Sequence, residues 1–395
     1  MMDGSASEGR LARALAERTG TEPQDWFFTF KARYGMREAF SAARETLGDG
    51  SAVSQLFTCL TAVTPILGAG LSPVYADESE ASWSIDPARL ELPADVRALS
   101  LQHTFGMVDA ASSARLAALA HGAGAVVVED CAHCVGRMAR GAGGAPVADV
   151  SVHSFGIEKI LPTQFGGAVW VNPDGLSAAF RARLRERLAA LPAPDAHTAA
   201  LARRYRAENR VLAHLPHAVS VRLRLGLARA GAIEPAVSED ERRGLPGRDP
   251  LAATDWVLDE AARGLGALDG IEGLRRETVS AFRRLLADMD GVSVPAAAME
   301  GEPQPLLRFP IVLADERRAD GAIRACLAAG LYAQPWYRPE LGPGVLDAGA
   351  FRVPRGRLGF PVHERLTAGC VALPADVGEE GARRAAEAVA GVLSS

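Results

Sequence analysis

A run of strand type, Ala125 to Val128, is the feature that most restricts the fold of this chain. It contains three consecutive valines, and two acidic residues, Glu129 and Asp130, follow it at once. An unbroken β-branched run is typical of a strand that is covered on both faces, as in a parallel sheet. Asp130 is therefore expected at the carboxyl edge of such a sheet, where open α/β folds bind their ligands.

Other strand-like runs alternate with helical stretches around this one. They lie at residues 71–77, 96–101, 150–153 and 168–171, and residues 110–123 have the apolar spacing of a helix. This alternation predicts an α/β domain with a mainly parallel, mixed sheet.

The second half of the chain differs in composition. Residues 176–240 are rich in Ala, Leu and Arg and are expected to be a helical insertion with breaks at Pro192, Pro194 and Pro216. A strand-like run at 307–313 and helical stretches at 251–266, 271–289, 318–329 and 381–393 indicate a smaller α/β domain. The expected division is a large domain over residues 1–240 and a small C-terminal domain over residues 241–395.

Lysine is almost absent from the chain. Of its 43 basic residues, 41 are arginine, and the two lysines are Lys31 and Lys159. A lysine that persists against such a bias suggests a role that arginine cannot fill. A primary amine can lose its proton, attack a carbonyl and form a Schiff base, whereas a guanidinium stays protonated. Lys159 closely follows the strand-like run at 150–153, the next such run after the one that precedes Asp130.

An acid and a lysine in this arrangement suit pyridoxal 5′-phosphate. This cofactor needs an acid that keeps its ring nitrogen protonated, so that the ring accepts electrons from a substrate carbanion. Asp130 is the expected acid, and Lys159 is the expected anchor and proton shuttle. His133 is placed to touch the ring or its 3′ oxygen, and the small hydroxyl of Ser154 is expected to bind the phosphate.

With these residues in order, the chain resembles the DegT/DnrJ/StrS family of fold-type-I, pyridoxal phosphate-dependent aminotransferases, as a divergent member. The pattern combines Glu129-Asp130-Cys131-Ala132-His133, then Ser154-Phe155 with Lys159, then Gly166-Gly167. Three upstream segments also resemble family elements in the same order: Gly35-Met36-Arg37, the turn from Gly70 to Asp77, and Gln102 to Gly106.

The resemblance implies further site residues. Gly35, Met36 and Arg37 correspond to the helix start that carries the cofactor phosphate. Cys59 stands where many members place an aromatic ring over the cofactor, and His103 is expected to stack on the ring or to pack at the sheet edge. Candidate substrate contacts in the C-terminal part are Arg308 and Trp336-Tyr337-Arg338.

The resemblance also implies an activity and an assembly. An amino acid, glutamate or glutamine, would donate its amino group to a keto or aldehyde acceptor, a sugar-like one in some members, within a biosynthetic pathway. The expected protein is a homodimer with the active site at the subunit interface. Two other functions stay open on the same fold: a lyase, elimination or replacement enzyme that uses the same cofactor, and a non-catalytic regulator.

Composition restricts the partners and the compartment. A net charge of −5 gives no sign of nucleic-acid binding, and no apolar run reaches the roughly 18–20 residues of a membrane span. Five scattered cysteines and a polar N-terminus favour the cytoplasm.

Cys131-x-x-Cys134 has the spacing of a redox or metal pair, but we interpret the two cysteines as small apolar residues that fill space in the core, and we expect no metal. The Arg-rich residues 181–224 are interpreted as a solvated helical face.

Overall fold

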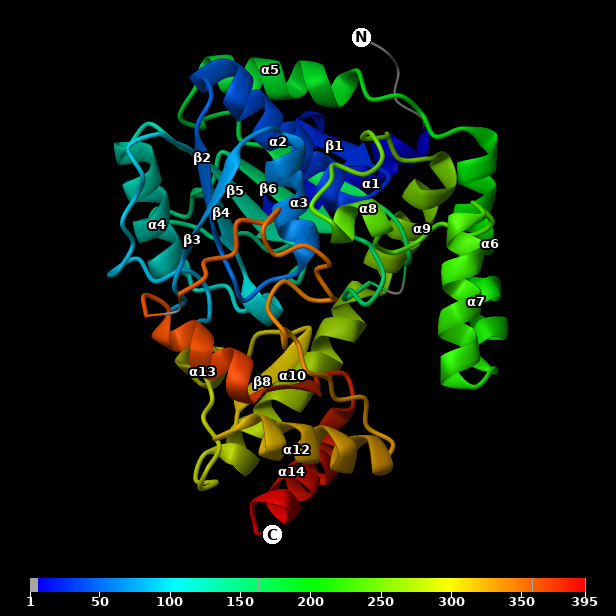
Figure 1. Ribbon diagram of the computed structural model, residues 1–395. Helices are drawn as coiled ribbons and strands as arrows, with labels where there is room; N and C mark the ends of the chain where they lie inside the picture. Colours follow the sequence, from blue (N-terminus) through cyan, green and yellow to red (C-terminus); the bar gives the residue numbers. More distant parts are fainter. Residues whose placement is uncertain (1–5, 162, 357, 395) are drawn as a thin grey trace.

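A seven-stranded sheet forms the centre of the computed structural model, which describes residues 6–161, 163–356 and 358–394 (Figure 1). The strand order is β1-β7-β6-β5-β4-β2-β3. The strands are β1 (Trp26–Thr29), β2 (Ser51–Gln55), β3 (Ser72–Ala76), β4 (Val96–Gln102), β5 (Val126–Cys131), β6 (Val150–Ser154) and β7 (Gly167–Val171). Neighbours from β3 to β6 pair in parallel, whereas β7 pairs antiparallel with both β6 and β1. The predicted mainly parallel, mixed sheet is confirmed.

Helices cover both faces of this sheet, because alternate residues of each strand point to opposite sides. Val126 and Val128 pack in one cluster with α2 (Ala32–Leu47) and α5 (Ala178–Ala189). Val127 packs in another cluster with α4 (Ala110–Gly122). The central strand is therefore buried on both faces, as its unbroken apolar run predicts.

The segment at 176–240 is helical, as predicted, and its helices end near the expected prolines. It holds α5, then α6 (Ala196–Ala213), α7 (His217–Arg229) and the short α8 (Glu239–Arg242). Pro192 and Pro194 lie between α5 and α6, and Pro216 is the N-cap of α7. Figure 1 shows α6 and α7 side by side, away from the central sheet.

A smaller α/β unit completes the chain. Its strands β8 (Arg308–Val312) and β9 (Cys370–Pro374) pair antiparallel. Its helices are α10 (Leu268–Leu286), α11 (Ala296–Met299), α12 (Glu316–Ala328), α13 (Pro361–Gly369) and α14 (Gly378–Leu393). The helix α14 packs on α10 and α12, at the narrow end of the molecule in Figure 1.

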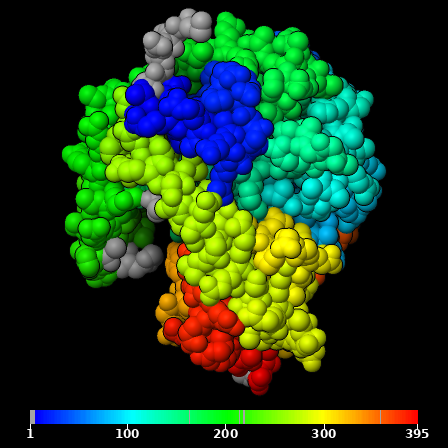
Figure 2. All heavy atoms as spheres, turned by 180° about the vertical axis from the view of Figure 1, so that it is seen from behind, coloured from blue at the N-terminus to red at the C-terminus, as the bar shows by residue number. Residues whose placement is uncertain are grey.

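The segment that joins the sheet domain to the smaller C-terminal unit packs against the N-terminal helix. The helix α9 (Asp255–Gly266) lies against α1 (Ala6–Thr19), and Figure 2 shows the blue N-terminal helix beside the yellow-green segment. A boundary at about residue 240 stays a prediction, but this packing favours one near residue 268, where α10 begins. Among the described residues, no helix combines the length and the apolar character that crossing a bilayer requires.

Gly167 marks the closest approach between β7 and the start of α2. A Cβ atom on Gly167 would lie 2.4 Å from Ala32 Cα and 2.7 Å from Ala32 N. Backbone atoms cannot move aside as a flexible side chain can, so we expect Gly167→Ala to lower the free energy of unfolding by about 1–3 kcal/mol. Thermal unfolding followed by circular dichroism measures this change. Gly273→Ala is the matched control, because a Cβ atom on this exposed helical glycine would meet nothing within 4 Å. A melting temperature for Gly167→Ala equal to that of the wild type would contradict the steric argument.

Candidate active site

A cavity of about 430 Å³ lies at the carboxyl edge of β4, β5 and β6. The starts of α2 and of α3 (Leu60–Gly68) form one side of it, and residues 335–343 form another. Seven of the predicted site residues line this cavity: Met36, Cys59, His103, Asp130, His133, Ser154 and Lys159. Five different segments of the chain therefore bring these side chains together.

Asp130 is the buried carboxylate of the cavity, near the end of β5. Its side chain is 7% exposed, and Ala132 N donates a hydrogen bond to Oδ1 (2.9 Å). That is the only hydrogen bond to this carboxylate within the described ranges, so Oδ2 is left for a ligand. Burial raises the pKa of Asp130, although the hydrogen bond from Ala132 and the charge of Lys159 oppose the rise.

Lys159 lies in the connection between β6 and β7. Its Nζ atom is 5.9 Å from the ring centroid of Trp336, and the described part of the chain gives it no hydrogen bond or ion pair. Burial lowers the pKa of Lys159, against the raising effects of Cys59 and Asp130. A lowered pKa increases the fraction of unprotonated amine, which is the nucleophilic form.

His133 is held by protein atoms at both ring nitrogens. Phe105 N donates to Nδ1 (3.1 Å), so we assign the ring proton to Nε2, which lies 3.2 Å from Tyr337 Oη. Burial lowers the pKa of His133 far below its ordinary value, and the imidazole is therefore neutral. Its ring also stacks on Trp336, with centroids 5.9 Å apart. The expected contact of His133 with the 3′ oxygen of a cofactor stays a prediction.

Three other predicted residues in the cavity, Ser154, His103 and Cys59, each contact a neighbouring polar group. Ser154 Oγ accepts a hydrogen bond from Gly156 N (3.2 Å) at the end of β6. His103 Nε2 is 2.8 Å from Glu129 Oε1, and both side chains are almost fully buried. Cys59 is the N-cap of α3, and its Sγ atom lies 2.9 Å from Thr61 Oγ1.

The prediction for Gly35 and Arg37 is corrected by the structure, which places both outside the cavity. The helix α2 begins at Ala32, so residues 35–37 lie about one turn inside it. A Cβ atom on Gly35 would lie 2.3 Å from Val169 Cγ2, and Gly35 therefore serves the packing of α2 on β7. Arg37 bonds outward to Asp249 (3.3 Å). The residues at the start of α2 that do line the cavity are Lys31, Ala32 and Arg33.

Lys31 is a cavity residue to which sequence reasoning assigned no role. Its Nζ atom donates to Glu234 Oε1 (2.6 Å) and to Pro235 O (3.1 Å). Burial, together with the charge of Arg33, lowers the pKa of Lys31 to about 8, although Glu234 opposes this effect. The signal for Lys31 was its scarcity in an Arg-rich chain, which it shares with Lys159.

Trp336 and Tyr337 form an aromatic wall opposite the sheet edge. Both line the cavity, as their mention among the candidate substrate contacts suggested. The two rings stack, with centroids 5.7 Å apart, and each also stacks on His133. Burial raises the pKa of Tyr337 far above its ordinary value, so its phenol keeps its proton.

Sequence comparison finds a family similarity over the part of the chain that holds this site. Residues 42–189 match the model of the DegT/DnrJ/EryC1/StrS aminotransferase family, and this span contains the ends of β4, β5 and β6 with Asp130 and Lys159. Over these residues the chain is similar to this family. Curated proteins are also similar to the chain over limited lengths. GDP-perosamine synthase of Caulobacter vibrioides is 29% identical over 136 residues, which are 34% of this chain and 36% of that protein. The pleiotropic regulatory protein of Geobacillus stearothermophilus is 30% identical over 142 residues, 35% of this chain and 37% of that protein.

The match therefore spans little more than a third of the length of these curated relatives. The likeness in fold is wider. The crystal structure of NtdA from Bacillus subtilis, with the bound cofactor PMP, aligns with 99% of this chain and 78% of that chain. The TM-score is 0.70 at 13% identity, and this likeness confirms the expected α/β fold of pyridoxal phosphate-dependent enzymes.

Proposed function

We propose that this protein is a pyridoxal 5′-phosphate-dependent aminotransferase that moves an amino group from an amino-acid donor to a keto or aldehyde acceptor. The observation that carries the proposal is the meeting of Lys159 and Asp130 in one cavity. One supplies an amine with a lowered pKa, and the other supplies a buried carboxylate with an unused oxygen. The similarity of residues 42–189 to an aminotransferase family supports the same activity.

The residues of the cavity fit this cofactor. Asp130 Oδ2 suits a protonated ring nitrogen, and the Lys159 amine suits an aldehyde carbon. The hydroxyl of Ser154 and the start of α2 suit a phosphate, because a helix N-terminus favours negative charge. When bound, the cofactor supplies an electron sink for the carbanion that forms when the substrate loses a proton.

In this proposal each side chain has one task. Lys159 Nζ would hold the cofactor covalently, and its amine would accept and return the substrate proton. Asp130 keeps the ring nitrogen charged. His133 orients Tyr337 through the 3.2 Å contact, and Tyr337 then presents a phenol that stays protonated. The rings of Trp336 and Tyr337 exclude water from that side of the cavity.

The substrates and the assembly are also proposals. We assign glutamate or glutamine as the donor. We assign a sugar-like acceptor because a relative that matches part of the chain is a GDP-perosamine synthase. We further propose a homodimer with the cavity at the subunit interface.

A spectroscopic half-reaction tests the activity. The purified protein, loaded with pyridoxal 5′-phosphate, is mixed with L-glutamate or L-glutamine in the absence of any acceptor. We expect the absorbance band of the lysine-bound cofactor to disappear, one equivalent of 2-oxo acid to form, and the aminated cofactor to stay on the protein. Adding 2-oxoglutarate should then restore the original band.

Two other results would each support a different function. Release of ammonia without accumulation of the aminated cofactor would indicate elimination chemistry. An unchanged spectrum with every common amino acid would contradict the aminotransferase and favour a regulator.

A further inference from the structure

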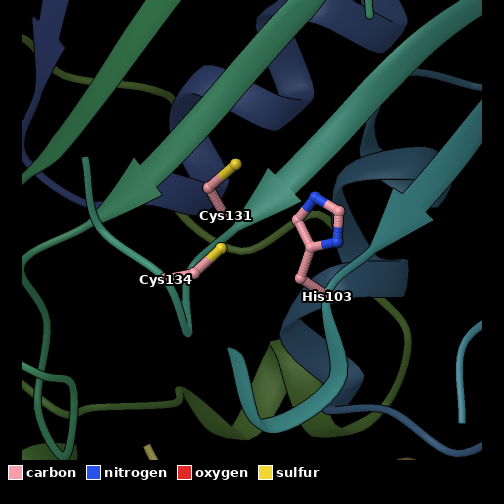
Figure 3. Close-up of side chains that lie close together, drawn as sticks. All are labelled: His103, Cys131 and Cys134. Atoms are coloured by element: carbon pink, nitrogen blue, oxygen red, sulfur yellow. The ribbon is translucent and has the colours of Figure 1, made fainter. Parts of the chain in front are cut away.

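Three buried side chains converge behind the candidate active site. The ligand atoms of His103, Cys131 and Cys134 all lie within 4.8 Å of one another. All three residues are at most 1% exposed. Figure 3 shows the two sulfur atoms on the same side of the imidazole. From this convergence we propose that His103, Cys131 and Cys134, with Glu129 as the fourth ligand, bind a zinc ion.

The backbone explains why these atoms meet. His103 follows β4, Cys131 ends β5, and β4 pairs with β5 in parallel, so both residues come from the same edge of the sheet. Cys134 N donates to Cys131 O (3.0 Å), and this turn returns the second sulfur toward the first. Ligand atoms around one zinc ion are about 3.5–4 Å apart, given bonds of about 2.3 Å to sulfur and 2.0 Å to nitrogen. Small side-chain rotations therefore suffice to close the site.

Glu129, which is not one of the three converging residues, would supply the fourth ligand from the same strand as Cys131. Its Oε1 atom is 2.8 Å from His103 Nε2, and its side chain is fully buried. Ala139 N donates to Oε1 (2.6 Å), and Ser151 Oγ donates to Oε2. These two donors fix the carboxylate in the way that outer partners orient metal ligands.

The ligand types favour zinc with a structural role. Two thiolates and an imidazole suit zinc among the common divalent ions, and four protein ligands leave no open coordination position for catalysis. Cys131 and Cys134 pack on the side of α1, in the cluster that contains Leu11 and Leu15, whereas His103 also borders the cavity. The ion would join the end of β5 to the turn that carries His133, and would hold Asp130 and His133 in place.

The burial of the four ligands also determines when a zinc ion could bind. No ligand atom is accessible from bulk solvent in the folded protein, so the ion must bind during folding and is expected to resist chelators afterwards. Metal analysis is therefore made on protein produced in zinc-supplemented medium and purified in the presence of a chelator. It requires neither the cofactor nor activity.

We expect about one zinc ion per chain in the wild type and at least a tenfold loss in Cys134→Ser. The matched control is Cys326→Ser, which changes a buried cysteine of the small domain and should keep the full zinc content. X-ray absorption at the zinc edge of the wild type should show two sulfur neighbours at about 2.3 Å. This second measurement decides the matter if Cys134→Ser fails to fold.

Three results would overturn the proposal. They are a wild type with less than 0.1 zinc per chain, a zinc ion without sulfur neighbours, and a Cys134→Ser protein that keeps its zinc.

Discussion

Replacing Lys159 by alanine is expected to remove the covalent link between the protein and pyridoxal 5′-phosphate. Treatment with borohydride should attach the cofactor permanently to the wild type but not to Lys159→Ala. We also expect transamination to fall by about 10³-fold or more, because the nucleophile and the proton carrier are lost together. The absorbance spectrum and the mass of the reduced protein measure the link, and the half-reaction with glutamate measures the activity.

The matched control is the other lysine of the chain. Lys31 lines the same cavity, and burial lowers its pKa to about 8, so it is the one rival amine in a chain with two lysines. We expect Lys31→Arg to keep the borohydride-stable link, since Nζ of Lys31 is already engaged by Glu234. If the link persists in Lys159→Ala and disappears in Lys31→Arg, the anchor has been assigned to the wrong residue.

Replacing Asp130 by asparagine is expected to separate cofactor binding from catalysis. The amide has nearly the same shape, and its oxygen can still accept the hydrogen bond from Ala132 N. It carries no negative charge, however, and cannot keep the ring nitrogen protonated. We therefore expect the Lys159 link to form while transamination falls by about 10²–10³-fold, the loss seen when a positioned electrostatic partner is removed.

The pH dependence of the activity provides a second test of the Asp130→Asn substitution. Burial raises the pKa of Asp130, so the wild-type carboxylate loses its charge at a higher pH than an ordinary aspartate. Activity should fall as the pH decreases through that pKa, and this acid limb should be absent in Asp130→Asn. Asp109→Asn is the control, because it makes the same chemical change at the N-cap of α4, where asparagine also caps. Equal losses in the two variants would show that the charge of Asp130 has no special role.

Local patterns predicted the centre of the fold well. The run before Asp130 was identified as a buried strand because a strand covered on both faces needs apolar residues at every position. The family resemblance aligned residues 35–37 with the helix start that carries the phosphate, but α2 begins at Ala32, after its N-cap Lys31. Lys31 makes no side-chain capping hydrogen bond, so no Ser, Thr, Asp or Asn marks this start in the sequence.

The far wall of the cavity depends on contacts that no local pattern contains. Tyr337 meets His133 across 204 positions of sequence, and this contact depends on the packing of residues 335–343 against the sheet edge. Lys31 is a different case. The scarcity of lysine is visible in the sequence, but it was interpreted as a sign of function only for Lys159. The position of Lys31 depends on Gly167, which allows the start of α2 to approach β7 closely.

The two walls of the cavity come from distant parts of the chain. Asp130 and Lys159 follow the central sheet, whereas Trp336 and Tyr337 belong to the same core cluster as β8 and β9. A compound that fills the space between them acts as a bridge that joins the C-terminal unit to the sheet. Because the bound compound contacts both, a saturated protein should resist heat and proteases better than an empty one.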